Sequence, residues 1–162
     1  MQITKNEIDS VREHLFEILT GAPTHIDFAD AVADLPRHLR GVKPERQPHT
    51  PWRLVEHMRI TQWDILQFIL DEAYVSPDWP AGYWPDGDAP PDGHAWDRSI
   101  ESFLNDRRAL TELANNPDVD IFAPIPHGTG QTIHREIILA ADHTSYHIGQ
   151  LIILRRLLGA WQ

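Results

Sequence analysis

Apolar side chains recur at the spacing of an amphipathic helix in four long segments of the chain. Residues typical of helix ends bound these segments, including a capping box formed by Thr4 and Glu7, a Thr50-Pro51 pair and a terminating Pro117. The pattern predicts helices near residues 4–21, 50–71, 93–116 and 133–158. No stretch alternates apolar and polar residues as a half-buried strand would, so the predicted fold class is all-α.

Two connections between the predicted helices, 22–49 and 72–93, are far longer than the roughly two to eight residues usual in up-and-down bundles. The first is expected to hold a short helix near 27–34. The second is rich in proline and aromatic residues and is longer than antiparallel neighbouring helices would need. Long ordered loops often form lids or binding walls, but a plain crossover covering a bundle end is equally compatible with this sequence. The prediction is one four-helix bundle domain over residues 1–162, with long crossover loops.

Charge and composition exclude several classes of partner. The formal net charge is -10, without a cluster of Lys and Arg, which disfavours nucleic acids and anionic membranes. The chain has no cysteine, so any nucleophilic thiol must belong to a substrate. The first ten residues are polar, and no apolar stretch is long enough to span a bilayer. We expect a cytoplasmic protein with no membrane partner.

His143 and His147 lie four residues apart in the last predicted helix, so both rings lie on one helix face and can hold the same metal ion. In a chain with ten histidines such a pair also arises by chance, with the rings exposed or in the core. The surrounding residues are apolar on nearly every side, and buried imidazoles need partners. A catalytic zinc site commonly has three protein ligands, and His57, at the edge of the apolar face of the second predicted helix, is the candidate third.

Other polar and aromatic residues are candidates for supporting roles. Gln150 and Glu136 share the stripe of the two histidines and could hydrogen-bond to them, although solvated side chains are the simpler interpretation. Tyr83 and Trp84, in the second long connection, are candidate substrate contacts near the open side of the ion. Tyr146 is another, either orienting substrate or packed between helices without a role in binding.

Several motifs together resemble the DinB/YfiT-like superfamily: Val55-Glu56-His57-Met58, Tyr83-Trp84-Pro85, and Asp142-His143-x3-His147-x-Gly149-Gln150-Leu151. The resemblance covers nearly the whole chain. It implies a four-helix bundle of unusual connectivity with a divalent metal bound by His57, His143 and His147. Members of this superfamily include transferases and isomerases that use a low-molecular-weight thiol, while many have no assigned reaction, so fold transfers better than function.

The expected function is therefore a metal-dependent reaction on a small molecule. An open dication held by neutral ligands can lower the pKa of a small thiol, which then attacks an electrophile. The same ion could instead activate water, which would make the protein a hydrolase. A third alternative is a non-catalytic metal-binding stress protein. Zinc is the first expected metal and nickel the second. Exposed apolar surface on the helices at 4–21 or 93–116 would permit a homodimer.

Overall fold

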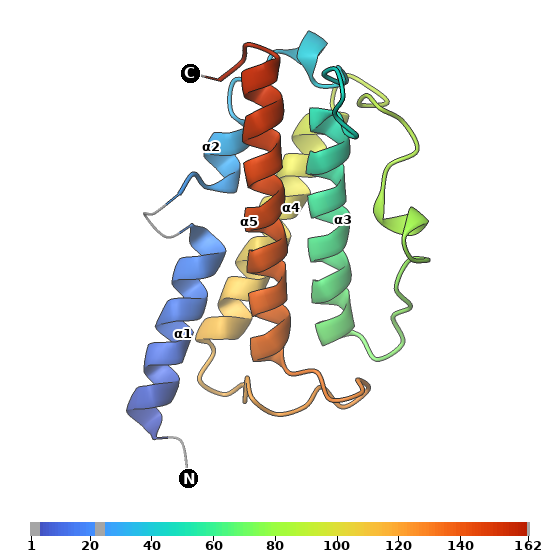
Figure 1. Ribbon diagram of the computed structural model, residues 1–162. Helices are drawn as coiled ribbons and strands as arrows, with labels where there is room; N and C mark the ends of the chain where they lie inside the picture. The colour runs from blue at the N-terminus through green and yellow to red at the C-terminus, as the bar shows by residue number, and fades with distance from the viewer. Residues whose placement is uncertain (1–3, 22–24, 162) are drawn as a thin grey trace.

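Five α-helices and two short 3-10 turns make up the regular structure of the described residues, 4–21 and 25–161, in the computed structural model (Figure 1). The elements are α1 (Lys5–Thr20), α2 (Phe28–Val32), η1 (Arg37–Leu39), α3 (Pro51–Leu70), η2 (Ala81–Tyr83), α4 (Ala95–Asn115) and α5 (Ile133–Leu157). The all-α prediction is confirmed, and the four long helices and the short one near residue 30 lie where the sequence pattern predicts them.

The helices begin and end where the sequence supplies capping groups. Thr4 and Glu7 form both bonds of the predicted capping box. The side chains of Thr50 and Thr132 accept hydrogen bonds from backbone N–H groups in the first turns of α3 and α5. Beyond the last turn of α5, Gly159 has a φ of 69°, a left-handed conformation that glycine adopts without strain. These caps fix the register of the two helices that carry the histidines.

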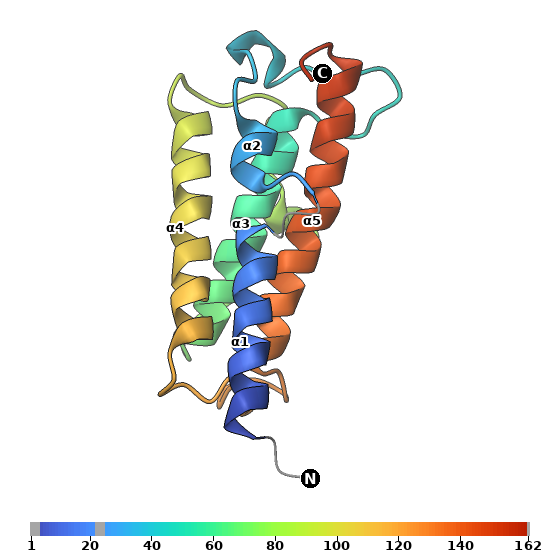
Figure 2. The same cartoon turned by 90° about the vertical axis from the view of Figure 1, so that its left-hand side faces the viewer.

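The four long helices lie side by side (Figures 1 and 2). α3 packs against α4 and α5, and α1 packs against the same two helices. The short helix α2 lies beyond the end of α1 and also packs against α5, so α1 and α2 together cover one side of the molecule. No helix in the described part of the chain is both long enough and apolar enough to cross a membrane.

The connection between α3 and α4 is long because these two helices run in the same direction (Figure 1). α3 has 20 residues and is therefore about 30 Å long, and the chain must travel back along it before α4 can begin. The intervening residues, 71–94, do this on the outside of α3. The sequence analysis expected this segment to be longer than needed to join the two helices. That expectation was wrong, because it assumed that the two helices are antiparallel.

The buried apolar side chains form two clusters, one toward each end of the helices. One cluster is centred on large aromatic residues, including Trp52, Trp96 and Phe103. The other is mainly aliphatic and includes Leu15, Leu110 and Ile137. Along α5, the aliphatic cluster ends at Ala141 and the aromatic cluster begins at Ile148. His143 and His147 lie between them, at the level where the two clusters meet.

Candidate metal centre

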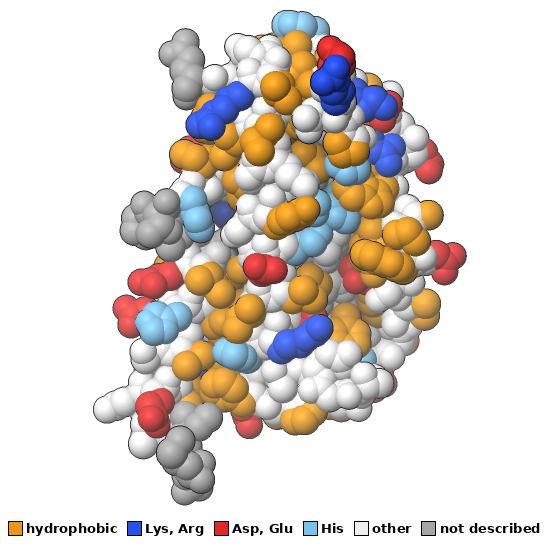
Figure 3. Space-filling model, viewed as in Figure 1, with side chains coloured by type: hydrophobic (Ala, Val, Ile, Leu, Met, Phe, Trp, Pro, Cys, Tyr) orange, Lys and Arg blue, Asp and Glu red, His pale blue; other side chains and the backbone are white. Residues whose placement is uncertain are grey.

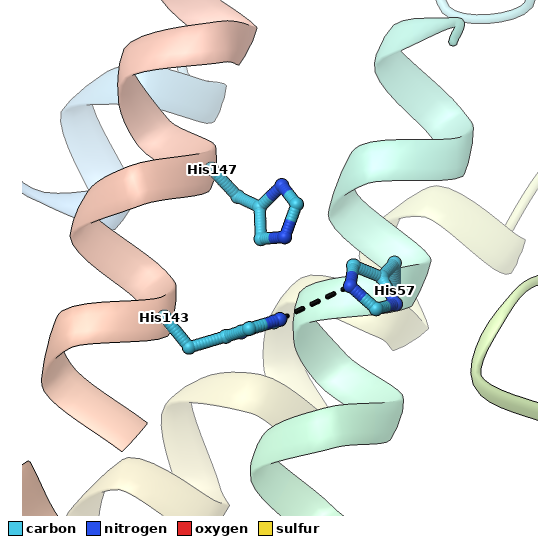
Figure 4. Close-up of side chains that lie close together, drawn as sticks. All are labelled: His57, His143 and His147. Atoms are coloured by element: carbon cyan, nitrogen blue, oxygen red, sulfur yellow. Dashed lines mark hydrogen bonds between the residues drawn. The ribbon is translucent and has the colours of Figure 1, made fainter. Parts of the chain in front are cut away.

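Three histidines from two helices converge between α3 and α5 (Figure 4). His57 projects from α3, and His143 and His147 project from successive turns of α5. One ring nitrogen from each residue lies within 4.8 Å of the others, and the Nε2 atoms of His57 and His143 are 3.0 Å apart. The three side chains that the sequence analysis named as ligands are thus close enough together to hold one metal ion.

A hydrogen bond to the second long connection determines which ring nitrogen of His57 carries the proton. Its Nδ1 donates to the backbone carbonyl of Tyr83 at 2.7 Å. Because a carbonyl oxygen only accepts, Nδ1 must carry the proton of the neutral ring, and Nε2 is left with a lone pair. A ring nitrogen in this state is the form that binds a metal.

His147 is oriented in the same way by a neighbour on its own helix. Its Nδ1 donates to Oε1 of Gln150 at 2.8 Å, which leaves Nε2 of His147 with a lone pair. Gln150 therefore contacts a predicted ligand and is not simply a solvated side chain, the interpretation that the sequence analysis took as simpler. Glu136, the other candidate, does not contact the histidines, because its buried carboxylate pairs with Arg135.

Burial keeps all three imidazoles neutral. It lowers the pKa of His57 to about 4, an effect only partly offset by the hydrogen bond to Tyr83. Burial, together with the neighbouring His147 and His57, lowers the pKa of His143 to about 3. The pKa of His147 is lowered by burial as well. Three neutral nitrogen donors around one point suit zinc or nickel better than calcium or magnesium, which prefer oxygen.

Trp84 covers the outer face of His57. Their rings are almost parallel, with centroids 3.8 Å apart, and His49 stacks on the opposite face of the same indole at 4.3 Å. Trp84 therefore lies against a predicted ligand, and that the connection lines a substrate pocket stays a prediction. Sequence analysis missed His49, because nothing in its spacing sets it apart from the other histidines. Its Nδ1 is buried without a hydrogen-bond partner in the described part of the chain.

Tyr83 supports the site through its backbone and anchors the loop through its side chain. Its ring is buried, and its hydroxyl donates to Asp64 at 2.8 Å. Burial and Asp64 raise the pKa of Tyr83 to about 12, which keeps the hydroxyl protonated as a donor. The hydroxyl therefore points toward Asp64, and only the carbonyl of Tyr83 meets a predicted metal ligand.

Tyr146 lies beside the cluster on the outer surface of α5. Its side chain is 64% exposed, so the alternative of a tyrosine packed between helices was wrong. Its ring meets the ring of His147 nearly at a right angle, with centroids 4.9 Å apart. Histidine side chains reach the surface between α5 and α3, among apolar side chains (Figure 3).

Comparison of the chain with protein-family models, curated proteins and solved structures finds no match.

Proposed function

We propose that this protein is a metal-dependent enzyme that activates a small external thiol at a site formed by His57, His143 and His147. We further propose that its helices form a single four-helix bundle domain of the DinB/YfiT type, and that it transfers or isomerises a group by way of the thiol. Zinc is the first candidate for the ion and nickel the second. The substrate is a small molecule, and nucleic acids and membranes are not partners.

One observation carries the proposal: three neutral imidazoles converge, of which His57 and His147 are buried and have their Nδ1 protons fixed by hydrogen bonds, while His143 is half-buried. Zinc binds imidazole nitrogen at about 2.0–2.1 Å, so two tetrahedral ligands lie about 3.3 Å apart. The Nε2 atoms of His57 and His143 are hydrogen-bonded at 3.0 Å, and the three ligand nitrogens lie within 4.8 Å of one another, so a bound ion would replace this hydrogen bond and draw the third nitrogen closer. A cluster built only to fill the core would gain nothing from such polar rings.

The neighbouring residues have distinct roles in this proposal. The ion, when bound, lowers the pKa of the thiol so that thiolate forms at neutral pH. Gln150 and the carbonyl of Tyr83 keep the rings of His147 and His57 oriented. Trp84 closes one side of the site against water, and Tyr146 offers an apolar ring and a hydroxyl at its exposed edge. The absence of cysteine from the chain favours an external thiol over an enzyme nucleophile.

Exposed apolar side chains on α1, among them Phe16 and Ile18, provide a surface for a homodimer, which we include in the proposal. None of the exposed large apolar side chains lies on α4, the other helix on which the sequence placed such a surface.

The test begins with elemental analysis of protein purified without an affinity tag, and continues with a screen of small thiols against a panel of electrophiles. Stoichiometric metal and thiol-dependent turnover are the expected results. Turnover without thiol would favour the hydrolase alternative, and stoichiometric metal without any turnover would favour the non-catalytic one. Protein without metal after dialysis against zinc would contradict all three.

A further inference from the structure

A small cavity lies about one helical turn from the histidine cluster, between the start of α3 and the end of α5. Its volume is about 90 Å³. The walls include four apolar side chains: Pro48, Leu54, Ile153 and Leu154. Leu54 lies three residues before His57, and Leu154 lies seven residues after His147, so the cavity adjoins the cluster on both helices.

Two polar side chains link the cavity to the cluster. Gln150 lines the cavity and accepts the hydrogen bond from His147. His49 also lines the cavity, and it stacks on Trp84, whose other face covers His57. The side chains of Gln150 and Trp84 thus lie between the cluster and the cavity, and a molecule bound at the histidines would reach the cavity by passing them.

The lining defines what can bind. None of the residues around the cavity is acidic or basic, apart from His49, whose pKa is lowered by burial and by the nearby Arg53. A charged group would be desolvated there without a partner. The buried Nδ1 of His49 has no hydrogen-bond partner in the described residues, so one polar atom of a ligand or a water molecule can be satisfied at that end.

The size of the cavity limits the length of the group. A cavity of about 150 Å³ in another protein accommodates benzene, which has six carbon atoms. By the same ratio, a cavity of about 90 Å³ accommodates three or four carbon atoms. From this size and lining we propose that the cavity is the subsite for the short uncharged aliphatic chain of the thiol substrate. This inference rests on the proposed function and adds the substrate class to it.

The test uses the protein loaded with cobalt(II), because a thiolate bound to cobalt has a charge-transfer absorption that is independent of turnover. Titration with ethanethiol, 1-butanethiol, 1-hexanethiol, 1-octanethiol and 1-decanethiol gives a dissociation constant for each. The first carbon atoms span the helical turn of about 5.4 Å between the cluster and the cavity, so the affinity should change little from ethanethiol to 1-butanethiol. Each of the next three or four methylenes enters the cavity and should tighten binding about fourfold. The affinity should then level off or fall for 1-decanethiol, whose chain is too long for the cavity.

Two variants test whether the dependence of thiol affinity on chain length arises in the cavity. Ile153→Trp fills the cavity from a half-exposed position, and it should remove the dependence on chain length while changing the affinity for ethanethiol less than about twofold. Ile138→Trp is the matched control, since Ile138 is also exposed on α5 and does not line the cavity. Ile138→Trp should retain the dependence of thiol affinity on chain length. Circular dichroism checks that both variants are folded.

The outcomes separate this inference from the proposed function. A charge-transfer band whose affinity does not depend on chain length in the unmodified protein would overturn the subsite and leave thiol activation in place. The same dependence in Ile153→Trp as in the unmodified protein would also overturn the subsite. Absence of the band with every thiol would overturn both the proposed function and the subsite.

Discussion

At the scale of single residues, two of the three histidines differ from ordinary surface histidines in burial and in a fixed tautomer. His57 and His147 are only 5% and 6% exposed, and each has its Nδ1 hydrogen bonded, so its Nε2 carries the lone pair that a metal requires. His143 is half-buried, and its Nε2 is hydrogen-bonded to Nε2 of His57. The spacing of His143 and His147 was visible in the sequence. The hydrogen bond from His57 was not, because its acceptor is a backbone carbonyl 26 residues away.

Replacement of either α5 histidine should abolish stoichiometric metal binding. His143→Ala or His147→Ala removes one of only three nitrogen donors, and should weaken zinc binding by more than the roughly 10–100-fold that loss of an outer hydrogen-bond partner costs. Competition with a zinc-binding dye measures this. His134→Ala is the control, because His134 lies on the same helix and packs against Phe122 away from the cluster. Full zinc retention in both cluster variants would refute the ligand assignment.

The pH dependence of metal binding should reflect the lowered pKa values of the buried rings. An unperturbed histidine would begin to lose metal near pH 6.5. The pKa values of about 4 for His57 and about 3 for His143 mean that protons compete with the metal only in more acidic solution. Zinc affinity should therefore change little between pH 7.5 and about 5.5, and fall as the pH approaches about 4.

The same depressed pKa values have a consequence for the stability of the metal-free protein. The unfolded chain binds protons below about pH 6.5, whereas the folded rings bind them only near pH 4 or below. The stability that neutral rings contribute is therefore present above pH 6.5 and is lost as pH falls through the folded pKa.

Circular dichroism at each pH must accompany the zinc titration, because the metal-free protein loses stability over the same pH range. A tenfold loss of affinity per pH unit from 6.5 downward, with the protein still folded, would contradict buried ligands.

At the scale of elements, the helices could be predicted closely and their spatial order could not. Caps and apolar spacing are local properties, so the bounds of α3 and α5 follow from residues such as Thr50 and Thr132. The parallel direction of α3 and α4 depends on packing between residues far apart in the sequence. For this reason the sequence analysis judged the connection longer than the two helices require. In the structure its length is needed to span α3, and it also brings Trp84 to His57.

Trp84→Ala should weaken thiol binding while leaving one metal ion per chain. The indole covers His57, and its removal exposes one side of the site to water without removing a ligand. We expect the dissociation constant for 1-propanethiol in the cobalt protein to rise about tenfold, equivalent to about 1.4 kcal/mol. Trp79→Ala is the matched control, since Trp79 belongs to the same connection and is 80% exposed. A lower melting temperature with unchanged thiol affinity would make Trp84 a structural cover only.

Gly149 should be replaceable in the middle of α5. It is exposed, and a Cβ built there meets no atom within 4 Å. Because glycine in a helix interior is less favourable than alanine, Gly149→Ala should stabilise the protein by about 0.5–1 kcal/mol. Gly159→Ala is the contrasting control: at a φ of 69° it should destabilise by about 1 kcal/mol. Urea unfolding measures both. Destabilisation by Gly149→Ala would indicate a close approach to that face by something outside the chain.

At the scale of the whole molecule, the five basic side chains between residues 37 and 53 are spread along the segment, and two of them lie near acidic residues of other elements. Arg40 lies near Asp97, and Arg53 lies near Asp88. Figure 3 shows basic and acidic side chains side by side at the end of the molecule where α5 finishes. The sequence alone gives the net charge, but the pairing across elements depends on how α3 and α4 pack.

This charge distribution predicts that the protein does not bind DNA by electrostatic attraction. Non-specific binding requires a basic surface that displaces counterions from the phosphates, whereas the net charge here is -10 and the arginines near residue 50 have acidic neighbours. In a gel-shift experiment at physiological salt, protein up to about 10 μM should give no complex with duplex DNA, since non-specific binding typically has a Kd of about 1–100 μM. Titration at low salt extends the test, because attraction to phosphates would be strongest there. A complex with micromolar affinity that dissociates steeply as salt rises would contradict this prediction, and would mean that the basic segment acts independently of its acidic neighbours.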